Sequence, residues 1–227
     1  MSPARRPAIR AITQSDDVLC LAPAPGHPKR RQALEELGAD YELRTLDMKA
    51  GEQWAPAFLS INPLGKVPAI EHGDVVVTEQ AAIFIYLADL YPEAKLAPAL
   101  GDPLRGCYLR WLVLYGSSFE PAVVDQAMKR GPGPQSMSPY GSYDALMDLL
   151  TSQVRKGPYL FGKRFTAADV LWATALGWTM NLKLVPSKLE LLRYVERFRT
   201  RSAVARAEAI DESLSRRLES DYETRTG

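Results

Sequence analysis

This chain of 227 residues has only two cysteines and two histidines, and its net charge is close to zero. The two cysteines, Cys20 and Cys107, have neither the spacing of a metal site nor that of a disulfide framework. Unpaired cysteines suit a reducing compartment, so we expect the cytoplasm. Acidic and basic residues nearly balance at a net charge of +1, which predicts neither a nucleic acid nor an anionic membrane as a partner.

Long hydrophobic runs are also missing. No apolar run approaches the ~20 residues of a membrane span, and the opening MSPARRPAIR lacks the apolar core of a secretory signal. The arginines of this opening leave two interpretations, a nucleic-acid arm or a solvated extension, and we favour an extension over residues 1–16. The apolar fraction of 46% is ample for a buried core, and the length suggests one or two domains.

The first half of the chain alternates strand and helix patterns. A strand is expected at 17–21, followed by a loop at 22–26 and a helix from Pro28 to Gly38. Alternation at 41–45 predicts a second strand, and the apolar residues of 54–58 predict one or two helical turns.

The most informative stretch is INPLGKVPAIEHGDVVVTEQAAIFIYLADLYP, residues 61–92. Val67-Pro68 places a proline directly before an apolar run, and only an X–Pro bond has a realistic chance of being cis. Two short strands around His72-Gly73-Asp74 predict a hairpin. Apolar residues at helical spacing then predict a helix after Glu79-Gln80; they are Ile83, Tyr86, Leu87 and Leu90.

The second half reads as helical. A proline- and glycine-containing stretch at 93–102 is the expected linker, 103–212 the expected helical bundle, and 213–227 a charged tail. Thr166 and Asp169 form a capping-box-like helix start, which we assign to folding. Three apolar helical faces are predicted, and their members are Cys107, Trp111, Leu114, Tyr115 and Ser118; Leu146, Leu149, Leu150 and Val154; and Leu191, Tyr194, Val195 and Phe198.

The block at 61–92 resembles the glutathione-binding half of the thioredoxin-like domain in cytosolic glutathione S-transferases. The family pattern is close to NPxGKVPxL, a hairpin, then ES-x-AI-x-x-YL. This chain departs from it at Gln80, where the family usually has Ser. The matching residues are Asn62, Pro63, Gly65, Lys66, Val67, Pro68, Glu79, Ala82, Ile83, Tyr86 and Leu87.

The resemblance covers about residues 17–210 and is of bacterial type, with the class unassigned. It implies an α/β plus all-α fold: an N-terminal thioredoxin-like domain at 17–92 followed by a C-terminal helical bundle. It also implies a homodimer that uses glutathione as co-substrate or ligand, with no metal.

The resemblance assigns the glutathione contacts as follows. Val67 offers its amide and carbonyl to an extended peptide in the manner of an added strand, unless Pro68 only shapes a turn. Glu79 pairs with the ligand's α-ammonium, or is a simple first-turn acid. Gln80 donates an amide hydrogen to a carboxylate at the helix N-terminus, and Lys66 either meets a carboxylate or is solvated.

Thiol activation is where the chain departs from the family, whose members place Ser, Tyr or Cys at the end of the first strand or in the loop after it. The loop at 23–27 has no hydroxyl and no thiol, and Cys20 is expected in the core, which disfavours cysteine-type chemistry. His27 is the candidate catalytic side chain, as an acceptor or as an imidazolium that lowers the thiol pKa. The alternative, which we favour, is that His27 is a solvated helix cap; the backbone amide of Gly26 is a second candidate for the catalytic group.

A small apolar electrophile is expected to bind between the domains, where ligand sites often lie. Candidate lining residues, each with a core interpretation beside it, are Tyr115, Trp111, Phe119 and Met128. Two functions therefore stand: a transferase that conjugates glutathione to such an electrophile or uses it in a related reaction, and a weakly catalytic or non-catalytic binding protein of the same fold. The missing hydroxyl favours the second, and we place the enzyme ahead.

Overall fold

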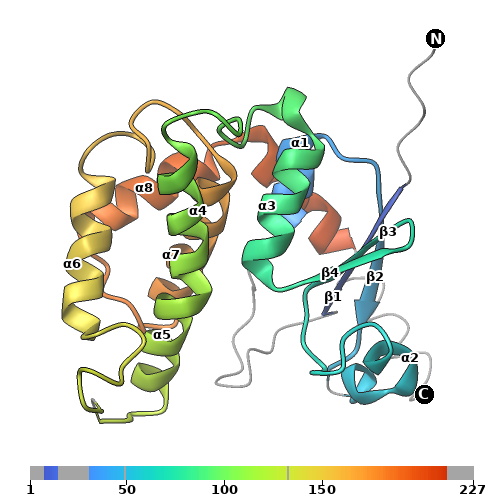
Figure 1. The fold of residues 1–227 in the computed structure, drawn as a ribbon, viewed down its shortest axis with the longest axis horizontal. Helices are drawn as coiled ribbons and strands as arrows, with labels where there is room; N and C mark the ends of the chain where they lie inside the picture. Colours follow the sequence, from blue (N-terminus) through green and yellow to red (C-terminus); the bar gives the residue numbers. More distant parts are fainter. Residues whose placement is uncertain (1–7, 15–30, 49, 132, 214–227) are drawn as a thin grey trace.

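The computed structural model describes residues 8–14, 31–48, 50–131 and 133–213. It has two halves (Figure 1): a sheet with helices on its faces, and a bundle of helices packed beside it. This is the thioredoxin-like domain followed by an all-helical domain that the resemblance implies.

The sheet has four strands in the order β2-β1-β3-β4. Their bounds are β1 Ile9–Gln14, β2 Tyr41–Leu46, β3 Ala69–His72 and β4 Val75–Thr78. Strand β1 runs parallel to β2 and antiparallel to β3, and β3 forms the predicted hairpin with β4. The first strand of the chain therefore lies in the middle of the sheet.

The position of β1 corrects the predicted domain start. The extension predicted for residues 1–16 is wrong for residues 9–14, and the strand predicted at 17–21 lies outside the described residues. Ile9 and Ala11 pack on one face of the sheet and Ile12 packs on the other, as the two-residue period of a strand requires. Arg10 lies 3.5 Å from Glu42 and 3.4 Å from Glu71 on the flanking strands, so this arginine pairs within the sheet.

Helices cover both faces of the sheet. Helices α1 (Arg31–Leu37) and α3 (Gln80–Leu90) share one apolar core with Ile9, Ala11 and Ile70. The short turns η1 (Glu52–Trp54) and α2 (Pro56–Leu59) lie on the other face, where Phe58 packs with Ile12, Leu46 and Ala69. Gly38 follows α1 with φ +60°, the left-handed conformation that ends helices, as predicted.

The second half is built from helices, and the short turn η2 (Pro92–Ala94) precedes it. Its elements are α4 Arg105–Leu114, the π-helical segment η3 Tyr115–Phe119, α5 Glu120–Ala127, α6 Tyr143–Val154, α7 Ala167–Asn181 and α8 Leu189–Arg199, with further helix at 202–213. Helix α7 is buried on nearly every side and forms the centre of the bundle. In the described part of the chain, no helix is long and apolar enough to cross a membrane.

The predicted capping box is present at the start of α7 and extends beyond its own helix. The buried carboxylate of Asp169 accepts hydrogen bonds from the backbone N of Thr166 (2.9 Å) and from its Oγ1 (3.0 Å). It also accepts from the backbone N of Leu160 (2.7 Å) and the hydroxyl of Tyr194 on α8 (3.0 Å). Burial raises the pKa of Asp169, and these hydrogen bonds oppose the rise.

Helix α1 joins the two halves through polar contacts. The buried guanidinium of Arg31 pairs with Asp211, and Thr174 of α7 donates a hydrogen bond to Oε1 of Gln32 (2.7 Å). On the next turn, Arg201 donates to Glu36 (2.8 Å between Nη2 and Oε2) and Arg206 to Glu35 (2.9 Å). These four charged or polar contacts along α1 thus fix the thioredoxin-like half against the bundle.

Candidate functional site

The loop before β3 is held rigidly by its own side chains. Asn62 is buried; its Nδ2 donates to the carbonyl of Lys66 (2.7 Å), and its Oδ1 accepts from the backbone N of Leu64 (3.1 Å). Gly65 has φ +61°, and a Cβ there would lie 2.6 Å from the ring of Trp54. The Asn and Gly of the matched motif therefore hold the turn that presents the next two residues.

Those next residues are Val67 and Pro68, and the peptide bond between them is cis. Both side chains are half-buried, and β3 begins at the following residue. The Lys66 side chain is exposed beside them.

Glu79 lies between β4 and α3 in a conformation that non-glycine residues rarely adopt, with φ 64° and ψ 121°. Its side chain is exposed, and its carbonyl accepts the first hydrogen bond of α3, from Ile83 N (2.9 Å). Gln80 begins the helix, and its Oε1 is buried with no hydrogen-bond partner among the described residues. Backbone strain beside an unsatisfied buried amide is typical of a ligand site.

The sheet register brings three residues into one row. Ile12 pairs with Ala69 in β3, and Ala69 pairs with Thr78 in β4. Both pairings stop there; extending each by one residue beyond the strand ends, we infer a row of Thr13, Pro68 and Glu79. Neighbouring strands are about 4.8 Å apart, so the row spans about 10 Å from the end of β1 to the start of α3.

Thr13 was missed by the sequence analysis. Its Oγ1 is buried and has no hydrogen-bond partner among the described residues, which leaves a hydroxyl at one end of the row. The thiol-activating residue was expected in the loop at 23–27, because the first strand was expected at 17–21. The sequence signal available was the apolar character of Ile9, Ala11 and Ile12, which is typical of a buried strand.

The predicted thiol-activating residues cannot be placed in this row. His27 and Gly26 lie outside the described residues, as does Cys20, which was expected in the core. The second cysteine, Cys107, is exposed on α4. Within the described ranges, no group of three or more His, Cys, Asp and Glu side chains is arranged to hold a metal ion.

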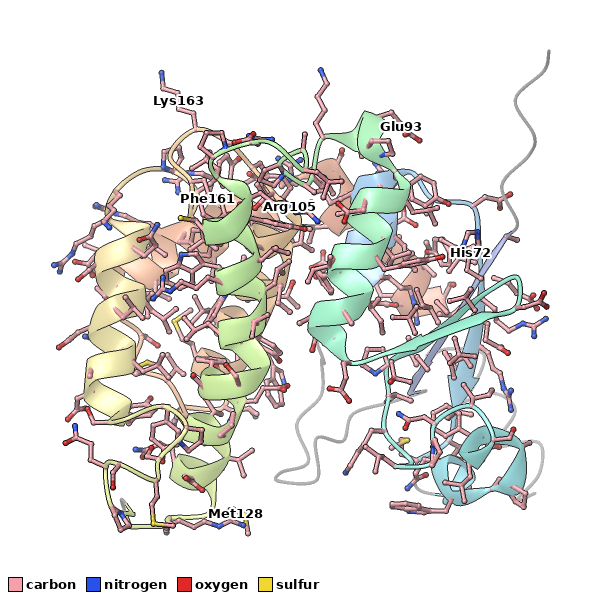
Figure 2. All side chains as sticks on the ribbon, viewed as in Figure 1. His72, Glu93, Arg105, Met128, Phe161 and Lys163 are labelled. Carbon is pink, nitrogen blue, oxygen red and sulfur yellow. The ribbon has the colours of Figure 1, made fainter. Side chains whose placement is uncertain are left out.

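Three of the predicted electrophile-pocket residues form one aromatic cluster around Trp172. Trp111 and Phe119 are 2% and 1% exposed, and their ring centroids lie 5.6 Å and 5.0 Å from that of Trp172. Tyr115 is 8% exposed, and its hydroxyl donates to Oε1 of Glu120 (2.8 Å), so the buried phenol has the partner it needs. Met128 is 49% exposed and lies at the far end of the bundle beyond α5 (Figure 2).

Comparisons with known families match both halves of the chain. The family model described as "Glutathione S-transferase, N-terminal domain" matches residues 25–89, and that described as "Glutathione S-transferase, C-terminal domain" matches residues 140–201. The first match contains Val67-Pro68 and Glu79, and the second contains the capping box.

Individual relatives agree with these matches. Glutathione S-transferase 1 of Dianthus caryophyllus is 44% identical over 68 residues, which are 30% of this chain and 31% of that protein, so this match spans about a third of the relative's length. Disulfide-bond oxidoreductase YfcG of Escherichia coli is 28% identical over 206 residues, 83% of this chain and 93% of that protein. A sphingomonad glutathione S-transferase, solved in complex with glutathione, superposes with a TM-score of 0.68 at 27% identity, covering 89% of this chain and 98% of that one.

The sheet topology, the row at the strand ends and both family matches define a thioredoxin-like protein with a helical second domain. The chain belongs to the glutathione S-transferase family and is an enzyme with glutathione-dependent activity.

Proposed function

We propose that this protein transfers the glutathione thiolate to a small apolar electrophile. The proposal is carried by the inferred row of Thr13, Pro68 and Glu79. One end is a buried hydroxyl with no hydrogen-bond partner in the described part of the chain, and the other is an exposed carboxylate. A row of about 10 Å suits the part of glutathione that lies between its two reactive ends, with the cysteinyl thiol at Thr13 and the α-ammonium of the γ-glutamyl group at Glu79.

Glu79 and the residues next to the row have distinct roles in binding. The backbone of Val67 pairs with the cysteinyl portion of the peptide, as an added strand does. Glu79 binds the α-ammonium, and the Gln80 amide, with its unpaired oxygen inside, directs its NH₂ toward the α-carboxylate at the helix N-terminus. Lys66 is placed to meet the glycyl carboxylate.

The Thr13 hydroxyl then donates a hydrogen bond to the sulfur. A hydrogen bond to the charged form favours that form, so the thiol pKa falls toward neutrality and the thiolate fraction rises. The thiolate attacks the electrophilic carbon, a C–S bond forms, and the leaving group departs with its electron pair. Tyr115, Trp111 and Phe119 are buried around Trp172, so they support the bundle next to α3 from inside and do not contact the substrate, while Met128 lies outside this cluster.

The test is Thr13→Val, which keeps the shape and removes the hydroxyl, beside Thr13→Ser, which keeps the hydroxyl. A hydrogen bond to a charged group contributes about 1.5–3 kcal/mol, which corresponds to about one to two pKa units. Thiolate absorbance of the glutathione complex should therefore titrate about one to two units higher in Thr13→Val. Conjugation of an aryl halide at pH 7 should slow by about tenfold or more, with Thr13→Ser close to wild type.

Equal thiol pKa values in wild type and Thr13→Val would remove Thr13 from the mechanism. Tight glutathione binding without conjugation above the protein-free rate would instead support the binding protein of the same fold.

A second glutathione-dependent reaction is favoured by the oxidoreductase YfcG, which matches this chain over 93% of its own length. In that reaction, the bound thiolate attacks a substrate disulfide, releases one thiol and leaves a mixed disulfide with glutathione. A second glutathione thiolate then releases the other thiol and forms glutathione disulfide. Parallel assays with an aryl halide and with bis(2-hydroxyethyl) disulfide separate the two activities, and we expect the cytoplasm to supply the reduced glutathione that both require.

A further inference from the structure

Strand β4 forms one edge of the sheet and carries none of the features that usually protect an edge (Figure 1). Natural edge strands carry lysines, prolines or bulges, because their unpaired backbone groups invite another strand. The four residues of β4 are three valines and a threonine, and all four pair with β3 in an unbroken register. Val75 and Val76 are 48% and 47% exposed. In the described part of the chain, no strand pairs with the outer side of this apolar edge.

The backbone groups of Val76 and Thr78 point away from the sheet. In a strand, the N–H and C=O groups of successive residues point to opposite sides. The two-residue turn Gly73-Asp74 closes the hairpin, so His72 and Val75 form its first hydrogen-bonded pair. Alternate residues from Val75 onward therefore bond to β3, and the residues between them face outward.

The central strands lead independently to the same assignment. The N–H of Ile9 in β1 donates to the carbonyl of Asp40, directly before β2. The next residue, Arg10, therefore directs its backbone groups to β3, where it pairs with Glu71. Glu71 also lies opposite Val76 in β4. Because the backbone groups of Glu71 are directed to β1, those of Val76 are left facing outward.

Two copies of β4 complement each other when they pair antiparallel about Val76. Each Val76 then exchanges two backbone hydrogen bonds with the partner's Val76. Val75 lies opposite the partner's Val77, so every valine of the strand faces a valine. Asp74 lies opposite the partner's Thr78 on the same face, where the carboxylate accepts a hydrogen bond from the hydroxyl.

Other arrangements are less favourable. A shift of one residue would set Asp74 opposite the partner's Glu79, two like charges, and would turn the outward groups of Val76 to a residue whose groups face inward. The opposite edge of the sheet, β2, carries the charged residues Glu42 and Arg44, which disfavour pairing there. The assembly therefore closes at two copies and does not continue as a fibre.

We propose that two copies of this chain join through β4 into one continuous sheet of eight strands, four from each copy, with the two-fold axis at Val76. The partner strand satisfies the outward backbone groups and covers the exposed valines. Because Glu79 directly follows β4, each glutathione row ends beside this interface.

Val76→Pro tests the backbone pairing. Proline lacks the N–H, yet an edge position whose N–H faces outward tolerates it, so the hairpin should still form. The matched control Val76→Thr keeps the N–H and the β-branched shape. We expect sedimentation equilibrium to give a dimer dissociation constant raised by about tenfold or more in Val76→Pro, and close to wild type in Val76→Thr. Circular dichroism checks that both variants are folded.

Cysteine cross-linking locates the axis even where Val76→Pro does not fold. The Cα atoms of a hydrogen-bonded pair lie about 5.5 Å apart, within the range of a disulfide. In a chain whose native cysteines are replaced by serine, oxidation with diamide should join Val76→Cys chains into dimers. Glu42→Cys, exposed on the opposite edge, should stay uncrosslinked.

Three results would each overturn the proposal. They are an unchanged dimer affinity in folded Val76→Pro, the absence of the Val76→Cys cross-link, and a wild-type mass of 25.2 kDa at micromolar concentration. A dimer that persists in folded Val76→Pro would place the interface on another face of the molecule.

Discussion

Glu79 adopts a strained backbone conformation, which destabilises the fold, while its carboxylate stays exposed and open to a ligand. A non-glycine residue in such a region costs on the order of 1–3 kcal/mol, which persists only where the surroundings impose it. The hairpin on one side and the start of α3 on the other supply that constraint.

Glu79→Gly should therefore stabilise the fold and weaken glutathione binding. Relief of strain, less the extra chain entropy of glycine of about 0.5–1 kcal/mol, leaves a net gain of up to about 2 kcal/mol in the free energy of unfolding. Loss of the carboxylate should weaken binding by about 1.5–3 kcal/mol. Urea unfolding and calorimetry measure the two effects, and Glu79→Ala should weaken binding equally without the gain in stability. Full glutathione affinity in folded Glu79→Gly would exclude Glu79 from the site.

Tyr41 gives the protein a pH-dependent stability at the alkaline end. Burial and the hydrogen bond from its hydroxyl to Glu35 (2.8 Å) raise its pKa from 10.0 to about 12. Between these values the unfolded chain loses the proton and the folded chain keeps it, so this contribution is complete below pH 10 and is lost as pH rises toward 12.

The difference in unfolding free energy between wild type and Tyr41→Phe isolates this effect, because the other titrating groups are common to both. We expect wild type to lose stability relative to Tyr41→Phe as pH rises from 10 toward 12. A difference that stays constant with pH would show that Tyr41 ionises normally in the folded protein.

At the scale of elements, the start of α7 connects three parts of the bundle. The four groups that approach the Asp169 carboxylate are all hydrogen-bond donors, so an acceptor-only side chain is required. Each carboxylate oxygen accepts from two of those donors, so the amide of an Asn at this position would turn its NH₂ toward two of them. We expect Asp169→Asn to cost about 2–4 kcal/mol in unfolding free energy, since it leaves buried groups unpaired.

Ser142→Ala is the comparison for this prediction, because Ser142 caps α6 alone with one hydrogen bond from Ala145 N (3.2 Å). Its loss should cost only about 0.5–2 kcal/mol. Neither change should alter glutathione affinity per folded molecule. Similar costs for the two variants would mean that Leu160 and Tyr194 gain little from Asp169.

The elements that the sequence predicted well are those whose patterns are local. The hairpin, α3, α6, the buried face of α8 and the capping box all follow from periodicity and turn residues close in the chain. On α4 the predicted apolar face is wrong at one position: Cys107 is exposed, and Tyr108, one residue later, is buried instead.

Strand β1 could not be chosen from local pattern alone. Both Ile9–Gln14 and the stretch at 17–21 are short and apolar enough, and only pairing with β2 and β3 selects the first. Thr13 was lost with that choice, since its proposed role depends on Pro68, 55 positions away (68 − 13), which becomes a neighbour only when the β1–β3 register is extended. No sequence pattern predicted the strained backbone of Glu79 either.

At the scale of the whole molecule, we expect a C2 homodimer, the commonest closed assembly. Exposed valines lie on the edge strand β4 and on α4: Val75, Val76 and Val113. Light scattering at micromolar concentration should give about twice the chain mass of 25.2 kDa. Val76→Arg should shift the protein toward monomer. A measured mass of 25.2 kDa for the wild type, that of one chain, would refute the homodimer.

Helix α1 makes the two halves of this enzyme specific for each other. Arg31, Gln32, Glu35 and Glu36 each contact a residue of the bundle. Three of these contacts need opposite charges at their two ends, and the fourth needs the Gln32 amide and the Thr174 hydroxyl. A chimera that joins this thioredoxin-like half to a relative's bundle would keep its apolar packing yet face mismatched charges along one helix. Compatibility between exchanged domains should therefore follow these four positions, and restoring them in pairs should rescue a chimera that otherwise fails to assemble.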